Sequence, residues 1–186
     1  MATTLEREIK LQFPDVATAR AAIVEAGATP MRGRRFQEDS LLDSADETLR
    51  SRRCVLRIRT ESGRSLLTYK GPVQPSPMKL REERETVVAD GETLLHLLEQ
   101  LGFHVWFRYQ KYREEFGCQD AIVALDETPI GVFVEVEGSE AAIRQMAAAL
   151  GRSEADFLLD SSRGLYVRYC DQHGLPCTHM VFSEQS

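Results

Sequence analysis

Long apolar runs are missing from this sequence, and with them the signature of a membrane-spanning chain. No stretch approaches the roughly 18 consecutive apolar residues of a spanning helix, and residues 1–4 lack the charged and apolar regions of a signal peptide. The cysteines contain no Cys-x-x-Cys pair, so we expect reduced thiols rather than a disulfide framework. These features predict a cytoplasmic location.

An excess of basic residues is also lacking. The formal net charge is -6, which argues against nucleic acid or a membrane surface as partner, because both are anionic. Local basic clusters remain at residues 32–35 and 50–53, and these either face phosphate groups or form ordinary solvated surface.

Low-complexity tracts and internal repeats are absent from the sequence. The 186 residues, 42% of them hydrophobic and 28% charged, suit one globular domain with a proper core. We therefore expect a single domain over residues 1–186, with its core at about 5–170 and a C-terminal tail at about 171–186.

What the sequence does contain is repeated alternation of charged and apolar residues. A side-chain period of two is typical of a β-strand with one apolar face. Amphipathic helices are predicted at residues 16–26, 90–100 and 139–151, with Asp15 capping the first, and shorter helical stretches at 154–159 and from 161 onward. The predicted strands are residues 5–11, 36–42, 54–60, 65–70, 78–89, 103–116, 121–126 and 132–137.

Charged side chains share one face of these strands, and the other face is mainly Leu, Ile and Val. An open sheet would turn the charged face to water. A closed barrel would instead enclose it as a wet lumen, at a cost that matched charges reduce. The charged set is Glu6, Glu8, Lys10, Arg57, Arg59, Lys70, Arg81, Glu83, Glu85, Lys111, Arg113, Asp126, Glu135 and Glu137.

A lumen with both signs of charge suits a polyphosphate ligand. Arg and Lys bind phosphate oxygens, Arg often with two parallel hydrogen bonds. Clustered carboxylates hold Mg²⁺ or Mn²⁺ against the same oxygens. A ligand bearing only carboxylates would leave the acidic residues without a purpose.

Short charged motifs recur in a fixed order along the predicted strands. They are Glu6-x-Glu8-x-Lys10, Arg57-x-Arg59, Lys70-Gly71-Pro72, Arg81-x-Glu83-x-Glu85, Lys111-x-Arg113, Asp126 and Glu135-x-Glu137. In this order they resemble the CYTH superfamily, the triphosphate tunnel metalloenzymes, over residues 6 to about 165. The chain is most similar to bacterial proteins of the class IV adenylate cyclase-like and thiamine triphosphatase-like kinds.

The resemblance implies an α+β fold, a closed eight-stranded antiparallel barrel with helices packed on its outside. It implies a metal-dependent enzyme acting on a small triphosphate such as ATP, thiamine triphosphate or tripolyphosphate, with Mg²⁺ or Mn²⁺ as cofactor. Arg57, Arg59 and Lys70 would act in catalysis. Phosphate contacts would come from Lys10, Arg57, Arg59, Lys70, Arg81, Lys111 and Arg113, and metal contacts from Glu6, Glu8, Glu83, Glu85, Asp126, Glu135 and Glu137.

Three reactions remain open on this basis. Hydrolysis is favoured because it needs no nucleoside pocket, and the aromatic residues that many members have are here Leu41 and Leu42. The alternatives are cyclisation of ATP to cyclic AMP and pyrophosphate, and non-catalytic binding of a triphosphate or polyphosphate. Many members also carry a Ser-Tyr pair where this chain has Ser162-Arg163, and Arg163 is either an added phosphate ligand or a surface residue.

Two further features concern the surface and the tail. Trp106 and Tyr109 are expected on the outer wall or in a dimer contact, since the resemblance implies homodimers, and His96 and His104 are expected at the surface or in packing. The tail offers thiolate and imidazole ligands of the kind that zinc takes, and a frayed tail is the alternative. These tail residues are Cys170, His173, Cys177 and His179.

Overall fold

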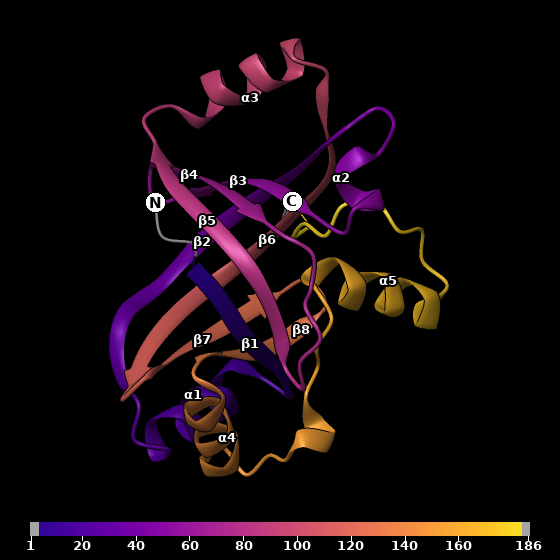
Figure 1. Cartoon of the computed structure of the whole chain (residues 1–186). Coiled ribbons are helices and arrows are strands. Elements are labelled where there is room, and N and C mark those ends of the chain that lie inside the picture. Colours follow the sequence, from indigo (N-terminus) through magenta and orange to yellow (C-terminus); the bar gives the residue numbers. More distant parts are fainter. Residues whose placement is uncertain (1–3, 184–186) are drawn as a thin grey trace.

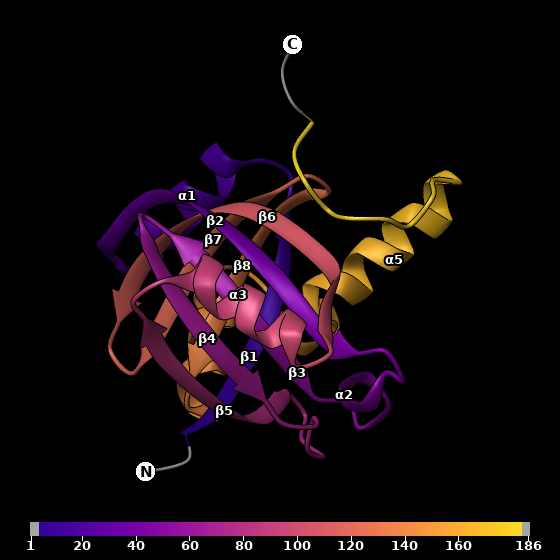
Figure 2. The ribbon, with the colours of Figure 1, turned by 90° about the horizontal axis from the view of Figure 1, so that it is seen from above.

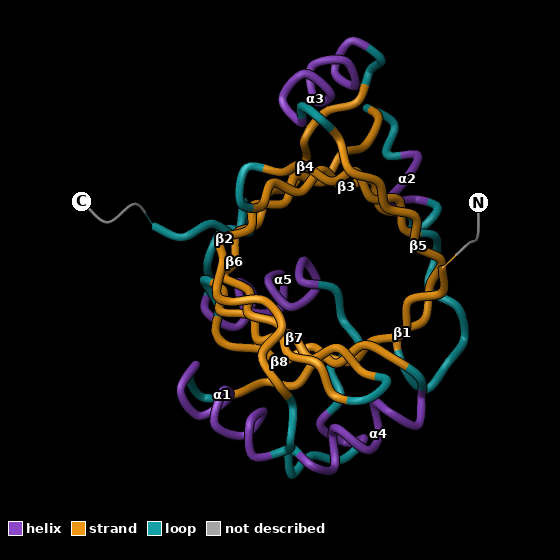
Figure 3. The backbone as a smooth tube through the Cα atoms, turned by 90° about the vertical axis from the view of Figure 1, so that its left-hand side faces the viewer, coloured by secondary structure: helices purple, strands orange, loops and turns teal. Residues whose placement is uncertain are grey.

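Eight antiparallel strands close into a barrel in the computed structural model, which describes residues 4–183. The order around the barrel is β1-β5-β4-β3-β2-β6-β7-β8, and β1 closes the ring by pairing with both β5 and β8. Figure 3 looks along this ring. The strands are β1 (Thr4–Phe13), β2 (Thr29–Ser44), β3 (Val55–Glu61), β4 (Arg64–Lys70), β5 (Lys79–Val88), β6 (Phe103–Cys118), β7 (Ala121–Thr128) and β8 (Gly131–Gly138).

The main hydrophobic core lies outside the barrel wall, not inside it. Ile9 and Leu11 of β1 and Val134 of β8 are fully buried there, against Ile23 and Ile143 of the covering helices. Each such side chain contributes about 1.5–3 kcal/mol through burial. The period of two in each strand then turns the intervening charged residues inward, which excludes the open sheet.

Helices cover the barrel on two opposite sides. α1 (Val16–Glu25) and α4 (Glu140–Ala149) pack on β1, β7 and β8, and α3 (Gly91–Gln100) lies over β3, β4 and β6 (Figures 1 and 2). The predicted cap Asp15 accepts a hydrogen bond from the Thr18 N–H at 2.7 Å. Within residues 4–183, no helix is long and apolar enough to cross a membrane.

The fifth helix, α5 (Ser162–His173), lies at one end of the barrel rather than along its side (Figures 1 and 3). Backbone hydrogen bonds between Lys10 and Leu158 hold the segment that leads into it. That pairing corrects the predicted helix at 154–159, because only η1 (Glu154–Asp156) is helical, as a single 3₁₀ turn.

The chain after α5 returns to the barrel and packs on β6. Met180 is almost fully buried, its N–H donates to the Arg108 carbonyl at 3.0 Å, and its carbonyl accepts from Gln110 N–H at 2.9 Å. The frayed tail is therefore wrong for residues 180–182. The short helix α2 (Thr48–Ser51) was not among the helices predicted from the sequence.

Candidate active site

A cavity of about 700 Å³ occupies the inside of the barrel. Every site residue proposed from the sequence lines it, except Asp126. Asp126 is buried beneath the lining and accepts hydrogen bonds from Lys111 and Arg113. The strand alternation has thus brought the charged motifs of β1, β3, β4, β5, β6 and β8 into one enclosed lumen.

Carboxylates gather on one wall, formed by β1, β5 and β8. In the strand register, Glu8 of β1 lies directly opposite Glu137 of β8, and Glu83 of β5 lies opposite Thr4 of β1. Burial, and then the carboxylates of Glu6, Glu135 and Glu8, raise the pKa of Glu137 to about 7. This wall therefore concentrates negative charge that prefers a proton or a cation.

Lysine side chains neutralise part of that wall. Lys70 Nζ lies 2.7 Å from a Glu6 oxygen and 3.0 Å from Glu83 Oε2. Lys10 Nζ lies 2.9 Å from both Glu8 Oε1 and Glu135 Oε2. Each lysine therefore bridges two carboxylates from different strands: Lys70 joins β1 to β5, and Lys10 joins β1 to β8.

The pKa of Glu8 shows which effect dominates at this wall. Burial and the neighbouring Glu135 carboxylate would raise that pKa, but Lys10, Lys79 and Lys70 outweigh both and lower it to about 2. Lys79 was not assigned to the site from the sequence. It is buried, lines the cavity and pairs with Glu8, because β5 places it opposite Glu8 in the register.

Arginines occupy the facing wall and share a buried carboxylate. Asp39 is 0% exposed, and its oxygens lie 2.9 Å from Arg59 Nε and 3.3 Å from Arg57 Nε. Burial would raise the pKa of Asp39, but Arg59 and Arg57 lower it below its ordinary value. Asp39 thus fixes both guanidinium groups. It lies in the lumen-facing phase of β2, which is the signal that could have identified it.

A third group joins β6, β7 and β8. Arg113 contacts Asp126 at 2.6 Å and Glu135 at 3.1 Å, and Lys111 contacts Asp126 at 2.8 Å. Burial and the adjacent Arg113 lower the pKa of Lys111 to about 8, despite the opposing effects of Asp126 and Glu135. Asp126 is therefore engaged by cations and does not join the carboxylates of β1 and β5.

Arg81 is directed at the main chain. Its Nη2 donates to the Gly71 carbonyl at 2.6 Å and to the carbonyls of Lys70 and Arg53 at 3.3 Å, while its Nε donates to Gly71 at 2.9 Å. Arg81 lines the cavity, yet these bonds tie together the ends of β3 and β4. Its phosphate contact stays a prediction.

The carboxylate wall fits Mg²⁺ or Mn²⁺ by its chemistry, since both cations take oxygen ligands. In residues 4–183, however, no three His, Cys, Asp or Glu side chains are arranged to hold a metal ion. The lysines described above hold the oxygens instead. The zinc site predicted in the tail is wrong, because the described residues of the tail form no such cluster of ligands either. His179 Nδ1 accepts from the Arg108 N–H, and Cys177 Sγ accepts from Arg163.

The end of the cavity beside α5 has a different lining. Trp106, Tyr109, Leu41 and Arg163 all line it, so Trp106 and Tyr109 do not belong to the outer wall and Arg163 is not merely a surface residue. Arg50 and Arg53 of the second basic cluster also line this end, whereas Arg34 pairs with Glu127 away from the cavity. His96 and His104 are exposed, as expected.

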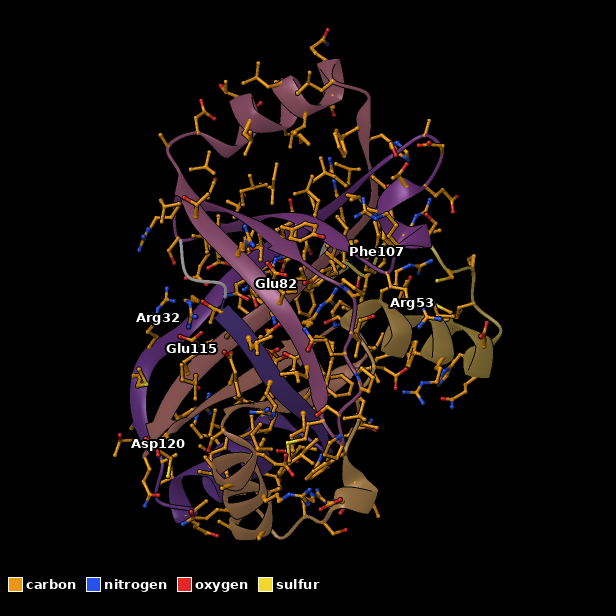
Figure 4. The ribbon with its side chains drawn as sticks, in the orientation of Figure 1. Arg32, Arg53, Glu82, Phe107, Glu115 and Asp120 are labelled. Carbon is orange, nitrogen blue, oxygen red and sulfur yellow. The ribbon has the colours of Figure 1, made fainter. Side chains whose placement is uncertain are left out.

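Figure 4 separates the two ends of the barrel: Arg53 and Phe107 lie on the side of α5, and Arg32 and Glu115 lie at the opposite end. Arg32 there pairs with Glu61 and Glu115, and Arg35 with the same two carboxylates. The first basic cluster is therefore neutralised by ion pairs and is not a phosphate-facing patch.

Comparisons with known proteins agree with this fold. A protein of Methanocaldococcus jannaschii, provisionally named an adenylate cyclase, is 32% identical over 136 residues, covering 73% of this chain and 77% of that protein. A solved Pyrococcus horikoshii OT3 protein is 25% identical, with a TM-score of 0.74 over 88% of this chain and 98% of the other.

Two more distant structures share the fold. A Vibrio parahaemolyticus protein, also provisionally an adenylate cyclase, is 20% identical with a TM-score of 0.74, covering 88% of this chain and 98% of its own. A Hippeastrum cyclase-named protein described as having a dominant triphosphatase activity is 17% identical with a TM-score of 0.63, covering 92% and 97%. The CYTH domain matches residues 4–159. This chain belongs to the CYTH family.

Proposed function

We propose that this chain is a metal-dependent phosphohydrolase that removes the terminal phosphoryl group of a small triphosphate. The observation that supports this most is the division of the lumen into an arginine and lysine wall and a carboxylate wall. A triphosphate alone would need only the first, and a metal ion alone only the second. The two walls together suit a triphosphate with its divalent cation.

The cationic wall binds and orients the substrate. Asp39 holds Arg57 and Arg59 in place before any ligand arrives, so little reorganisation is needed when the phosphate oxygens meet them. Guanidinium groups fixed in this way stabilise the charge that develops on the equatorial oxygens in the transition state. Water attacks the terminal phosphorus and the bond from this phosphorus to the bridging oxygen breaks. The diphosphate leaves with that oxygen and its electron pair, orthophosphate forms with the oxygen of the water, and solvent takes up the proton that the water loses.

The carboxylates proposed to hold the cation are Glu6, Glu8, Glu83, Glu85, Glu135 and Glu137, whereas Asp126 holds Lys111 and Arg113 from beneath the lining. When bound there, Mg²⁺ or Mn²⁺ supplies Lewis-acid polarisation of the phosphoryl oxygens. Lys10 and Lys70, which now pair with Glu8 and Glu6, would turn to the phosphates as the cation takes over these carboxylates. Charge inside the barrel would stay matched throughout, which limits the cost of enclosing it.

A cyclase is the second candidate, because three of the relatives described above carry a cyclase name. In that reaction the ribose 3′-hydroxyl of ATP attacks the α-phosphorus and pyrophosphate leaves. The same cations would serve, and the difference is which phosphorus faces the nucleophile. Binding without turnover is the third candidate, since the same charges give affinity in either case.

We propose a cytoplasmic location on the basis of four free cysteines in the chain.

Product analysis distinguishes the three candidates. ATP, thiamine triphosphate and tripolyphosphate are each incubated with Mg²⁺ or Mn²⁺, and orthophosphate, pyrophosphate and cyclic AMP are measured. Orthophosphate should be the main product, and Glu8→Gln should lower its rate at least tenfold, whereas Glu25→Gln on the exposed face of α1 serves as matched control. Cyclic AMP as main product would overturn the proposal, and tight binding without any product would favour the sensor.

A further inference from the structure

All lysines of this chain lie in the lumen, whereas arginines also serve the exposed surface. The lysines are Lys10, Lys70, Lys79 and Lys111, and each of them lines the cavity. Arg64 and Arg108, by contrast, are exposed. Because a lysine is almost never buried without a negatively charged partner, the partner of each ammonium group indicates what holds it in the lumen.

Lys79 shares one carboxylate oxygen with Lys10. Its Nζ donates to Glu8 Oε1, since β5 places Lys79 directly opposite Glu8 of β1. Lys10 Nζ donates to the same oxygen at 2.9 Å. The side chain of Lys79 is only 8% exposed, so water offers its charge little alternative. One carboxylate oxygen therefore serves two ammonium groups.

Lys79 also lacks a second carboxylate. Lys10 contacts Glu135 Oε2 at 2.9 Å in addition to Glu8, and Lys70 contacts two carboxylates of its own. Within residues 4–183, the only carboxylate that pairs with Lys79 is Glu8, and the charges of Lys10 and Lys70 repel it. A divalent cation that took Glu8 would thus leave Lys79 buried without a counter-charge, which is costly.

A phosphate group removes that cost. A lysine ammonium carries three N–H donors and binds phosphate as a point charge, so a triphosphate that enters with the cation supplies the negative charge that Lys79 would otherwise lack. A cation that enters alone supplies only more positive charge. Lys79 therefore opposes the cation by itself and favours the cation together with the triphosphate.

We propose that Lys79 occupies Glu8 in place of the divalent cation and turns to a phosphate oxygen when the triphosphate enters, so that cation and triphosphate bind cooperatively. The inference rests on the proposed function for the cation and the triphosphate, and adds a regulation of that site: the protein discriminates against a free cation. By linkage, the cation raises the affinity for the triphosphate by the same factor. A cross-strand pair that only joined β5 to β1 would have no such effect.

Calorimetry without turnover tests this coupling. The probe is diimidotriphosphate, in which NH groups replace the bridging oxygens of tripolyphosphate and block hydrolysis. Mn²⁺ and the preformed Mn²⁺–probe complex are titrated separately into the wild type and into Lys79→Met. The variant should bind Mn²⁺ alone about tenfold more tightly and the complex about tenfold more weakly, within the usual range of coupling between sites. These changes have opposite signs, which a general loss of stability does not produce.

Two control variants accompany this comparison. Lys79→Arg keeps the positive charge and should keep both affinities close to those of the wild type. Arg64→Met removes a positive charge from the exposed turn between β3 and β4, outside the cavity lining, and should likewise change both affinities little.

Nuclear magnetic resonance of ¹⁵N-labelled lysine gives a second readout in the wild-type protein, because every lysine side chain lies in the lumen. The Lys79 Nζ signal, assigned by its loss in Lys79→Arg, should shift when the Mg²⁺–probe complex is added. A Lys79 signal that ignores the complex, Mn²⁺ affinity that does not rise in Lys79→Met, or a complex that binds the variant as well as the wild type would overturn the inference. Cyclic AMP as the product of ATP would overturn the hydrolase proposal and leave these binding results intact.

Discussion

Glu137 shows how a single carboxyl reports on the whole acidic wall. Its pKa is raised to about 7, first by burial and then by Glu6, Glu135 and Glu8. In the metal-free protein the protonated form is favoured, so the stability linked to this group is present below its ordinary pKa and is lost as the pH rises through about 7. A cation must displace that proton before it can use the carboxylate.

Metal affinity should therefore increase with pH up to about 7 and then level off. Calorimetric titration with Mn²⁺ at several pH values, in two buffers with different ionisation enthalpies, measures both the affinity and the protons released. In Glu137→Gln the slope below pH 7 should become shallower. An affinity for Mn²⁺ that does not change between pH 5 and pH 7 would contradict the assignment of Glu137 to the metal side.

Arg81 is expected to act through the main chain. Its four hydrogen bonds to carbonyls include those to Lys70, which ends β4, and to Gly71, which follows it. Arg81→Lys keeps the charge but cannot span these acceptors, so Lys70 should lose its position and kcat should fall about tenfold, in line with hydrogen bonds from charged groups worth about 1.5–3 kcal/mol.

Hydrogen exchange at the Gly71 and Gln74 amides checks the mechanism of this loss, because both donate to β5 carbonyls. In Arg81→Lys both amides should exchange faster. Retained kcat with unchanged exchange would instead support a simple phosphate contact, for which a lysine can substitute as a point charge.

Individual site residues were predictable where they follow strand alternation. Glu6, Glu8 and Lys10 reach the lumen for that reason alone. Asp39 follows the same phase but was not assigned a role, since its purpose depends on Arg57 and Arg59 across the β2–β3 pair. Trp106 was wrongly placed outside the barrel because a β-bulge in the β2–β6 pair interrupts the alternation at this residue. Such a bulge depends on the register of two strands that are distant in sequence.

At the scale of elements, Gly138 ends β8 just before α4, where the neighbouring backbone leaves no room for a side chain. A Cβ there would lie 2.5 Å from the Asp120 carbonyl and 3.2 Å from the Ala121 Cα, both backbone atoms of the adjoining β7 segment. Gly138→Ala should therefore lower the free energy of unfolding by about 1–3 kcal/mol, as overpacking does.

Urea denaturation of Gly138→Ala and of Gly33→Ala measures this. Gly33, also in a strand, has open space where its Cβ would be, so its substitution should change stability by no more than about 0.5 kcal/mol. Equal stability of the two variants would show that the β6–β7 turn adapts more readily than its backbone contacts suggest.

Elements with regular alternation were predicted well, and those defined by distant contacts were not. The first half of β2 was missed because residues 29–34 are all exposed and carry no apolar phase. The helix expected at 154–159 is largely replaced by a bridge to Lys10. Docking of Met180 on β6 likewise depends on a partner seventy residues away in the chain, at Gln110 and Arg108.

For the whole molecule, the barrel encloses matched charges in a protein whose net charge is -6. A ligand that satisfies both walls should stabilise the folded state. At 100 times its Kd a triphosphate with Mg²⁺ should add about 2.7 kcal/mol, which raises Tm by about 5–10 °C for a chain of this size. Differential scanning calorimetry measures the rise, and Arg57→Ala should abolish most of it.

The most direct test of the proposed reaction is to follow the oxygen of water. Turnover of ATP with Mg²⁺ in ¹⁸O-labelled water, analysed by mass spectrometry and phosphorus NMR, identifies the phosphorus that is attacked. Hydrolysis at the terminal phosphorus predicts one labelled oxygen in orthophosphate and none in the nucleotide product. Label-free cyclic AMP and pyrophosphate would contradict the account, because the ribose hydroxyl and not water would then be the nucleophile.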